Sequence, residues 1–364
     1  MYYLYPMTIE KEFIATTFPP QHGKVSWSSP SNIALVKYWG KYGNQLPQNP
    51  SLSFTLTNCA TTTHLSFKPK EKKDQFSFSF LFEGKEQPSF HPKMEAFFER
   101  IKTFCPYLFE HDLTISSSNS FPHSSGIASS ASSMSALALA ILSIEEQGSN
   151  LLSQNDFLKK ASFIARLGSG SAARSVQGPM MSWGKTKSIQ GSSQEFATCI
   201  DQDIHPVFRS YQDTILIIDK GQKKVSSTLG HQLMENHAYA ASRFEQAHQH
   251  MERLMAILAS GEVEDFMQLV ELEALTLHAL MMASNPYFVL MQPNTLAVLN
   301  KIWAFREATK LPLCFTLDAG ANVHLLYPQE HKKAIETFIA SDLALFCEAG
   351  QYIEDQVGTG AKKL

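Results

Sequence analysis

The sequence predicts an α+β protein in which antiparallel or mixed sheets are covered by helices. Alternating apolar residues mark strands in the first third of the chain, and long helical patterns occupy much of the second half. The chain has 364 residues, and typical domains have about 100 to 200, so two domains are expected. A shift in composition after Ile204 places the predicted domains at residues 1–204 and 205–364.

The first half reads as a sheet with helices on one side. FSFSFLF at Phe76–Phe82 is an alternating run and suggests an antiparallel sheet with one buried face. Pro30 and Asn32 are expected to break the first strand. The other predicted elements are strands over Val25–Val36 and Ser51–Phe67, a turn over Lys68–Asp74, and helices near Lys93–Phe104, Ser129–Glu146 and Gln154–Ala165.

The second half reads as a smaller sheet with longer helices. Apolar residues at helical spacing dominate it, and three short β-branched or aromatic runs interrupt them. The predicted elements are helices over His231–Ala259, Val263–Met282 and Asn294–Thr309, and strands over Asp213–Ile218, Leu313–Leu317 and Val323–Tyr327.

Composition excludes several classes of partner. The chain is 44% hydrophobic and 18% charged, and its net charge of −3 gives no general attraction for nucleic acid or an anionic membrane. Its five cysteines are scattered without C-x-x-C spacing, which favours buried thiols in a reducing compartment over disulfides or zinc. Since no signal sequence and no apolar run of roughly 18 residues is present, a cytoplasmic protein is expected.

FPHSSGIASSASSMS at Phe121–Ser135 is the strongest candidate for a phosphate-binding loop. Its small residues leave backbone N–H groups open at the start of a helix, where the positive end of the helix dipole attracts anions. A flexible loop or an ordinary helix cap has the same composition, and the pattern is neither a P-loop nor a dinucleotide fingerprint. Ala136–Ile144, apolar on all sides, favours phosphate binding because a buried helix would hold the loop rigidly.

Two further segments combine cations with small or aromatic residues. In SPSNIALVKYWGKYG, Lys37 and Lys41 flank two aromatic residues, although most lysine pairs form a solvated face. In ARLGSGSAARS, a glycine-serine run that alone reads as a linker is followed at once by Arg174. The guanidinium of Arg174 suits bidentate contact with phosphate or carboxylate.

Two segments of the second half carry hydroxyl and carboxyl groups. In DKGQKKVSSTLGH the hydroxyls around Ser227 follow three lysines, but helix capping alone explains them. In CFTLDAGANVHLLYP, Asp318 follows an apolar strand and precedes a turn. An ordinary turn explains this aspartate, and a base or orienting group beside a bound anion is the alternative.

These segments together resemble the mevalonate diphosphate decarboxylases of the GHMP kinase superfamily. The resemblance lies in SNIALVKYWGK, FPHSSGIASSAS, RLGSGSAARS, VSSTLG and TLDAGANVHL, in that order, and it spans roughly Val25 to Gly360. It implies a two-domain GHMP-kinase-like fold with the active site in the interdomain cleft, usually in a homodimer. The implied reaction uses ATP with Mg²⁺ to phosphorylate the tertiary hydroxyl of (R)-mevalonate 5-diphosphate. Loss of that phosphate and of CO₂ then gives isopentenyl diphosphate.

The resemblance also implies roles for individual residues. Asp318 would lie beside the tertiary hydroxyl, as base or orienter, and Lys37 near the transferred phosphoryl group. Arg174 would hold the substrate carboxylate, with Asn32 next to it. The substrate diphosphate would lie among Tyr38, Lys41, Ser169, Gly170 and Ser171, and the ATP phosphates among Ser124, Ser125, Gly126, Ser129, Ser130 and Ser227.

Two histidines depart from the family pattern. His123 opens the phosphate loop where several relatives have threonine, and His231 follows the S-S-T-x-G run where relatives often have methionine. We assign His231 no catalytic role, because a lone histidine is usually structural. A decarboxylase acting on mevalonate monophosphate, a small-molecule kinase of the same superfamily and an inactive metabolite-binding protein stay open as alternatives.

Overall fold

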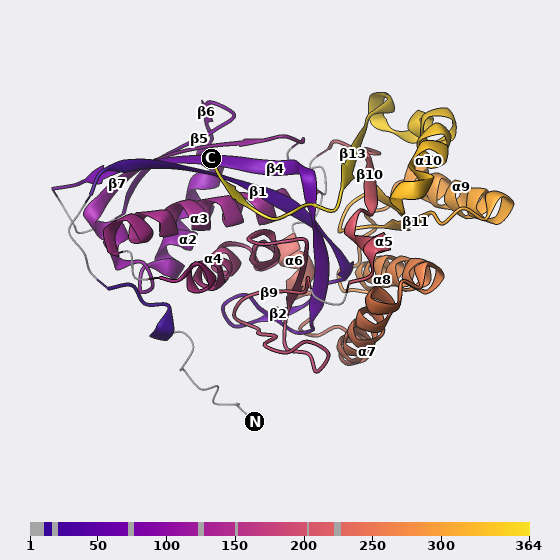
Figure 1. Ribbon diagram of the computed structural model, residues 1–364, viewed down its shortest axis with the longest axis horizontal. Helices are drawn as coiled ribbons and strands as arrows, with labels where there is room; N and C mark the ends of the chain where they lie inside the picture. The colour runs from indigo at the N-terminus through magenta and orange to yellow at the C-terminus, as the bar shows by residue number, and fades with distance from the viewer. Residues whose placement is uncertain are drawn as a thin grey trace.

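The first half of the chain forms a mixed sheet whose long central strands are β1 and β4 (Figure 1). The computed structural model describes residues 11–16, 21–71, 76–122, 127–149, 152–201, 204–221 and 227–364. The sheet order is β14-β1-β4-β7-β5-β6, with β8 on β4 and β9 on β8. The strands are β1 (Gly23–Val36), β4 (Ser51–Pro69), β5 (Ser77–Phe82), β6 (Lys85–Glu86), β7 (His111–Asn119), β8 (Met180–Trp183), β9 (Thr198–Cys199) and β14 (Lys362–Lys363).

Two expectations for this sheet were wrong. β5 pairs with β7 in parallel, because the connection between them includes helix α2 (His91–Ile101) and so forms a crossover. Pro30 and Asn32 do not end β1; the pairing with β4 shifts register between them and then continues. This irregularity adjusts the strand shortly before it delivers Lys37.

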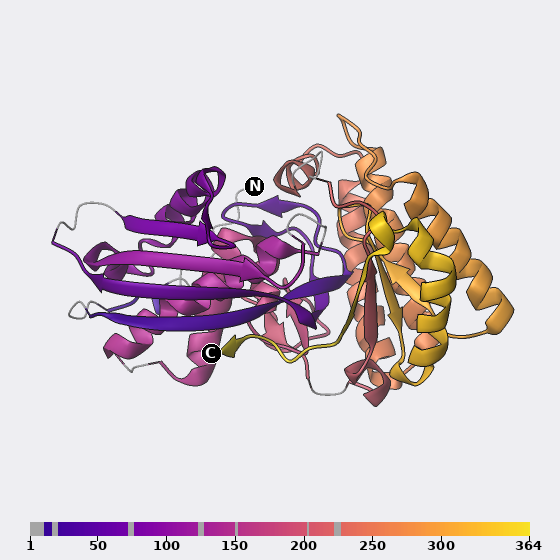
Figure 2. The same ribbon diagram turned by 90° about the horizontal axis from the view of Figure 1, so that it is seen from above.

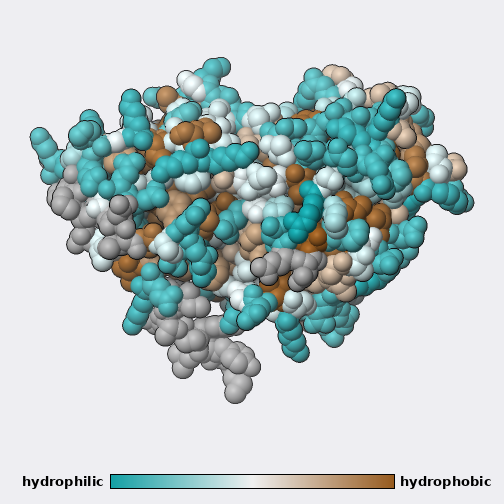
Figure 3. Space-filling model, in the orientation of Figure 1, coloured by the Kyte–Doolittle hydropathy of each residue, from teal (hydrophilic) through white to brown (hydrophobic). Residues whose placement is uncertain are grey.

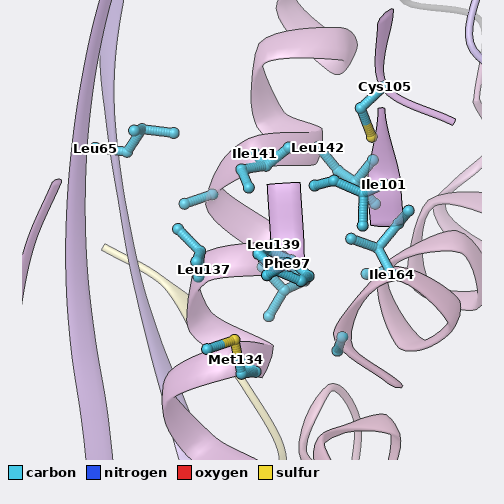
Figure 4. Packing of buried hydrophobic residues seen from close by; sticks show 14 of the residues in the cluster. Leu65, Phe97, Ile101, Cys105, Met134, Leu137, Leu139, Ile141, Leu142 and Ile164 are labelled. Carbon is cyan, nitrogen blue, oxygen red and sulfur yellow. The ribbon is translucent and has the colours of Figure 1, made fainter. Parts of the chain in front are cut away.

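Helix α3 (Ser129–Ser149) is the centre of the N-terminal core. As expected, its segment from Ala136 to Ile144 is buried on all sides. In Figure 4, Leu137 and Ile141 of α3 lie beside Leu65 of β4, and side chains of α2 and of α4 (Gln154–Gly168) complete the cluster. The helix that begins at the candidate phosphate loop is therefore held rigidly by packing.

The second half forms a four-stranded antiparallel sheet of order β11-β12-β10-β13 (Figure 2). One face packs on helices α7 and α8, and the other packs on α9 and α10. These elements are β10 (Gln212–Leu216), β11 (Cys314–Thr316), β12 (Val323–Tyr327), β13 (Tyr352–Gln356), α5 (Pro206–Arg209), α6 (Ser227–Gln232), α7 (Ala240–Ser260), α8 (Val263–Met282), α9 (Pro293–Thr309) and α10 (Lys332–Phe338).

Shorter elements complete the chain. The two-residue strands β2 (Lys41–Tyr42) and β3 (Leu46–Pro47) pair with each other just after β1. A 3₁₀ turn, η3 (Gly170–Ser175), follows α4. The other 3₁₀ segments are η1 (Pro88–Phe90), η2 (Pro106–Glu110), η4 (Gln329–His331), η6 (Ala344–Phe346) and η7 (Glu348–Gly350), and η5 (Ile339–Leu343) is a single π-helical turn.

The expected helix over His231–Ala259 is instead two helices, α6 and α7, separated by a turn segment. His237 holds this segment in place. Its Nδ1 accepts the N–H of Tyr239, and its Nε2 donates to the carbonyl of Leu280 at the end of α8. A tertiary contact thus competes successfully with helical periodicity.

One hydrophobic cluster crosses from the first sheet to the second. Ile33 and Leu35 of β1 share a buried core with Met251 and Leu254 of α7. The end of the chain also returns to the first sheet, where β14 pairs with β1. The proposed boundary near residue 205 stays a prediction.

The face of the molecule seen in Figure 3 is largely polar. Hydrophilic side chains cover much of the face in Figure 3, with hydrophobic residues in smaller groups between them. Within the described ranges, no helix is long and apolar enough to span a membrane.

Candidate active site

Lys37 and Asp318 form an ion pair where the two sheets meet. Strand β1 ends one residue before Lys37, and β11 ends two residues before Asp318. The Lys37 Nζ atom lies 3.0 Å from the Asp318 Oδ1 atom. The lysine side chain is only 2% exposed, whereas the aspartate is 26% exposed. A buried ammonium therefore fixes a carboxylate that remains open to a ligand.

Arg174 lies in η3 with its guanidinium fully buried. Its Nε donates to the Ser53 hydroxyl at 3.0 Å, and its Cζ lies 5.8 Å from the Trp183 ring centroid. Burial lowers the pKa of Arg174 to about 10, against the opposing effect of Asp318, so the side chain stays cationic at neutral pH. Among the described residues its Nη1 atom has no hydrogen-bond partner. A buried, charged and unpaired donor of this kind is suited to an anionic ligand.

Asn32 and Tyr38 present two more buried atoms without partners. Asn32 Nδ2 donates to the Ser175 hydroxyl at 2.8 Å and to the Ser171 carbonyl at 3.2 Å, which fixes the amide. Its Oδ1 atom and the Tyr38 hydroxyl have no hydrogen-bond partner within the described part of the chain. Burial raises the pKa of Tyr38, so its hydroxyl is a neutral donor. Polar atoms are rarely left unpaired in an interior, and binding of a polar ligand accounts for them.

Gly170 lets the Tyr38 ring lie against η3. A Cβ atom at Gly170 would lie 2.8 Å from the Tyr38 hydroxyl oxygen and 2.9 Å from the Trp183 ring. Both distances are too short for any side chain, so glycine is required by the close approach of an aromatic ring.

A row of serine hydroxyls connects the start of α3 with η3. Ser130 Oγ lies 3.3 Å from Ser169 Oγ, which lies 3.5 Å from Ser171 Oγ. The Ser129 carbonyl accepts hydrogen bonds from the Ser132 and Ser133 hydroxyls in the first turn of α3. The predicted nucleotide-binding and substrate-binding segments therefore touch.

The structure does not test every predicted site residue. Ser124, Ser125, Gly126 and His123 lie outside the described residues, and so does the side chain of Ser227 at the start of α6.

Lys41 begins β2, is partly buried, and donates to Gln45 Oε1 at 2.9 Å. Burial and the charge of Arg100 lower the pKa of Lys41.

His231 packs against the aromatic residues after β1. Its ring centroid lies 4.2 Å from that of Tyr38 and 4.8 Å from that of Trp39, and its Nδ1 accepts the Gly40 N–H at 3.0 Å. Burial, with the charges of Lys41 and Arg174, lowers the pKa of His231 to about 3. His231 is therefore a neutral packing residue at physiological pH.

Several residues around the site had no sequence signature. Ser53 and Trp183 lie in strands where alternation predicts only sheet packing, yet both contact Arg174. Glu273 and His278 lie in the apolar pattern of α8 and contact the backbones of Lys37 and Asp318. Within the described ranges, no group of three or more His, Cys, Asp or Glu residues is placed to hold a metal ion.

Comparison with known proteins gives one consistent family. Residues 29–195 match the family model of the diphosphomevalonate decarboxylase-like N-terminal domain. Residues 214–361 match the model of the mevalonate 5-diphosphate decarboxylase C-terminal domain.

Individual relatives agree over nearly the full chain. A diphosphomevalonate decarboxylase of Ganoderma lucidum is 28% identical, over 86% of this chain and 80% of that protein. A phosphomevalonate decarboxylase of Haloferax volcanii is 26% identical, over 84% of this chain and 89% of that protein.

Solved structures agree as well. The complex of MDDEF with MVAPP, AMPPCP and magnesium superposes with a TM-score of 0.80 at 26% identity, covering 94% of this chain and 99% of that one. Mevalonate diphosphate decarboxylase from Staphylococcus aureus gives a TM-score of 0.81 at 26% identity, with coverages of 94% and 98%. With both of its domains matched in order, the chain belongs to the mevalonate diphosphate decarboxylase family.

Proposed function

We propose that this protein converts (R)-mevalonate 5-diphosphate and ATP into isopentenyl diphosphate, ADP, phosphate and CO₂. The observation that carries this proposal is the Lys37–Asp318 ion pair beside Arg174, in a chain whose two domains both match this family. The MDDEF complex with MVAPP, AMPPCP and magnesium supports ATP, bound with Mg²⁺, as the second substrate.

In the first step the tertiary hydroxyl attacks the γ-phosphorus of ATP and ADP leaves. Asp318 would accept a hydrogen bond from that hydroxyl and take or orient its proton. Lys37 would lie beside the transferred phosphoryl group and offset its negative charge. The ion pair at 3.0 Å supports both roles because it fixes the carboxylate next to a cation.

In the second step the carbon–oxygen bond breaks and phosphate leaves with its electron pair. The bond between the neighbouring methylene carbon and the carboxylate then breaks, its electrons form the double bond, and CO₂ leaves. Arg174, with Asn32 next to it, would hold the carboxylate in line for this cleavage. The unpaired Nη1 atom of Arg174 supports this assignment.

The substrate diphosphate and the ATP phosphates must share one site. Two like charges about 4 Å apart repel by about 4 kcal/mol at an effective dielectric constant of 20. Lys41, Tyr38 and the hydroxyls of Ser169 and Ser171 would bind the substrate diphosphate. The ATP phosphates would lie at the start of α3, from Ser124 to Ser130, with Ser227 reaching them from α6.

We also propose a cytoplasmic homodimer. The cytoplasmic location is supported by the cysteines, which are all free and of which four are buried. The dimer rests on the family resemblance, and sedimentation of the purified protein tests it.

The reaction is tested by following ADP and CO₂ together after mixing the protein with Mg-ATP and (R)-mevalonate 5-diphosphate. We expect equal amounts of both. ADP without CO₂ would identify a kinase instead. Mevalonate 5-phosphate is compared in parallel because the Haloferax relative is a phosphomevalonate decarboxylase; a higher kcat/KM with the monophosphate would replace the substrate proposed here.

A further inference from the structure

Two side chains of helix α8 contact the backbones of Lys37 and Asp318. Glu273 and His278, on this one helix, are both buried and lie five residues apart. That spacing corresponds to a rise of about 7.5 Å along the helix axis. Neither side chain has a role in the reaction proposed above.

The backbone of Lys37 is held by groups outside the sheet. Its N–H donates to Glu273 Oε2 at 2.8 Å. Its carbonyl accepts from Arg243 Nη2 at 3.1 Å and from Asn49 Nδ2 at 3.0 Å. Glu273 and Arg243 thus bind the donor and the acceptor of the same residue.

Glu273 and Arg243 are themselves a fully buried ion pair. Arg243 donates to both oxygens of Glu273, at 2.7 Å and 2.6 Å, with side chains 1% and 0% exposed. His250 Nδ1 lies 2.5 Å from Glu273 Oε1. Burial alone would raise the pKa of Glu273, but His250 and Arg243 lower it to about 2. The Glu273–Arg243 pair that binds the Lys37 backbone is therefore charged, bidentate and shielded from water, and these three properties restrict its movement.

His278 holds the other member of the pair. Its Nε2 donates to the backbone carbonyl of Asp318 at 3.1 Å, just after β11 ends. Burial lowers the pKa of His278 to about 4, so the ring is neutral at pH 7 and keeps the proton it donates on Nε2. The same carbonyl also accepts the N–H of Gly320 at 2.7 Å, so His278 adds a bond from another helix to a local turn.

We infer that helices α7 and α8 position the catalytic pair: Arg243 of α7 and Glu273 of α8 set the backbone of Lys37, and His278 of α8 sets the backbone of Asp318. This rests on the proposed function, in which Lys37 and Asp318 act on the transferred group. Glu273, Arg243 and His278 are positioning residues, since each acts through another residue. A displacement of about 1 Å at a reacting group costs up to about 100-fold in rate, so a small shift of either backbone matters.

The test compares four variants on the same helix. Glu273→Gln removes the negative charge that pairs with Arg243. His278→Leu removes the ring N–H that His278 donates to the Asp318 carbonyl. His278→Gln restores an N–H at nearly the same place. Glu271→Gln is the matched control, because it also breaks an ion pair of α8, with Arg306 at 2.6 Å, on a side chain that bonds to Arg306 and Trp303.

Three measurements are made on each variant. The first is kcat for CO₂ release from mevalonate 5-diphosphate together with the KM of each substrate. The second is hydrogen exchange at the Lys37 amide, which does not depend on activity. Thermal unfolding of all four variants shows how much stability each has lost.

We expect Glu273→Gln and His278→Leu to lower kcat about 10- to 100-fold, with both KM values within about twofold of the parent. His278→Gln should recover most of the loss, and Glu271→Gln should keep the parent kcat even if it unfolds at a lower temperature. Exchange at Lys37 should be faster in Glu273→Gln than in Glu271→Gln.

The inference is overturned if Glu271→Gln loses as much kcat as Glu273→Gln, or if His278→Gln recovers nothing. If the parent protein releases no CO₂, the proposed function fails separately. Equal exchange at Lys37 in Glu273→Gln and Glu271→Gln would then still overturn the positioning role.

Discussion

The Lys37 ammonium and the Asp318 carboxylate lie 3.0 Å apart although 281 positions separate them in the sequence. Each follows the end of a strand in a different sheet, so the pair forms only when both parts of the chain have folded and docked. The hydrophobic cluster that joins β1 to α7 supplies this docking, and burial of such apolar surface is its main driving force.

Removing the charge of Asp318 should nearly abolish turnover. Asp318→Asn keeps the shape but loses the proton acceptor and the partner of Lys37. Loss of a general base costs about 10² to 10⁴ in rate. We expect kcat for ADP and for CO₂ to fall together by that factor, measured at saturating substrates. A variant with the kcat of the parent would remove Asp318 from the mechanism.

Replacing Arg174 by lysine should weaken use of the substrate. Lysine keeps the positive charge. Its single ammonium group cannot donate to the Ser53 hydroxyl and to a carboxylate from separate nitrogen atoms, as the planar guanidinium does. A lost hydrogen bond to a charged group is worth about 1.5 to 3 kcal/mol, or about 10- to 150-fold in kcat/KM for mevalonate 5-diphosphate. Arg306→Lys serves as the control, because Arg306 pairs with Glu271. Equal losses in the two variants would show a general effect of arginine replacement.

Tyr38→Phe should separate stability from substrate binding. The Tyr38 hydroxyl is buried without a hydrogen-bond partner among the described residues, so its removal should leave the free energy of unfolding unchanged or raise it by up to about 1 kcal/mol. The KM for mevalonate 5-diphosphate should rise. Tyr327→Phe is the contrast, because that hydroxyl lies 2.8 Å from Thr214 Oγ1. Tyr327→Phe should lower the free energy of unfolding by about 1 kcal/mol and leave the KM unchanged. A Tyr38→Phe variant that loses stability with an unchanged KM would show that the Tyr38 hydroxyl does not bind substrate.

His231 should make the protein less stable in mild acid. Its pKa falls from 6.5 to about 3 on folding, so between these values the unfolded chain binds the additional proton. Its stabilising contribution is present above pH 6.5 and decreases as pH falls. From pH 7 to pH 5 the loss is about 2 kcal/mol.

The His231→Met variant isolates this contribution. Its free energy of unfolding, measured with urea at pH 7 and pH 5, should fall by about 2 kcal/mol less than that of the parent. Between pH 7 and pH 9, where a histidine with these pKa values does not titrate, the two proteins should change in parallel. Parallel behaviour between pH 7 and pH 5 as well would show that His231 is not buried as described.

Sequence patterns predicted the elements well where one periodicity dominated. Helix α3 is buried as its unbroken apolar run indicates, and the alternating residues of β5 place Phe80 and Phe82 in the core. The parallel pairing of β5 was missed, because alternation describes the faces of a strand and not the direction of its neighbour. The break between α6 and α7 was missed because His237 is fixed by a contact with Leu280 from another helix.

The site was predictable only in part, for a similar reason. Lys37, Arg174 and Asp318 stand out as charged groups in apolar or glycine-rich segments. Glu273 and His278 do not, because a helix pattern gives no sign that one side chain contacts a distant backbone. Such contacts depend on how segments far apart in the sequence pack together, which residue spacing does not encode.

In the proposed reaction the tertiary hydroxyl is phosphorylated before CO₂ is lost. Mevalonate 5-diphosphate labelled with ¹⁸O in that hydroxyl tests it most directly, by mass spectrometry of the inorganic phosphate released with Mg-ATP. We expect one ¹⁸O atom in each phosphate formed, since the carbon–oxygen bond breaks after the phosphorus–oxygen bond has formed. Unlabelled phosphate, with the ¹⁸O in water, would contradict it.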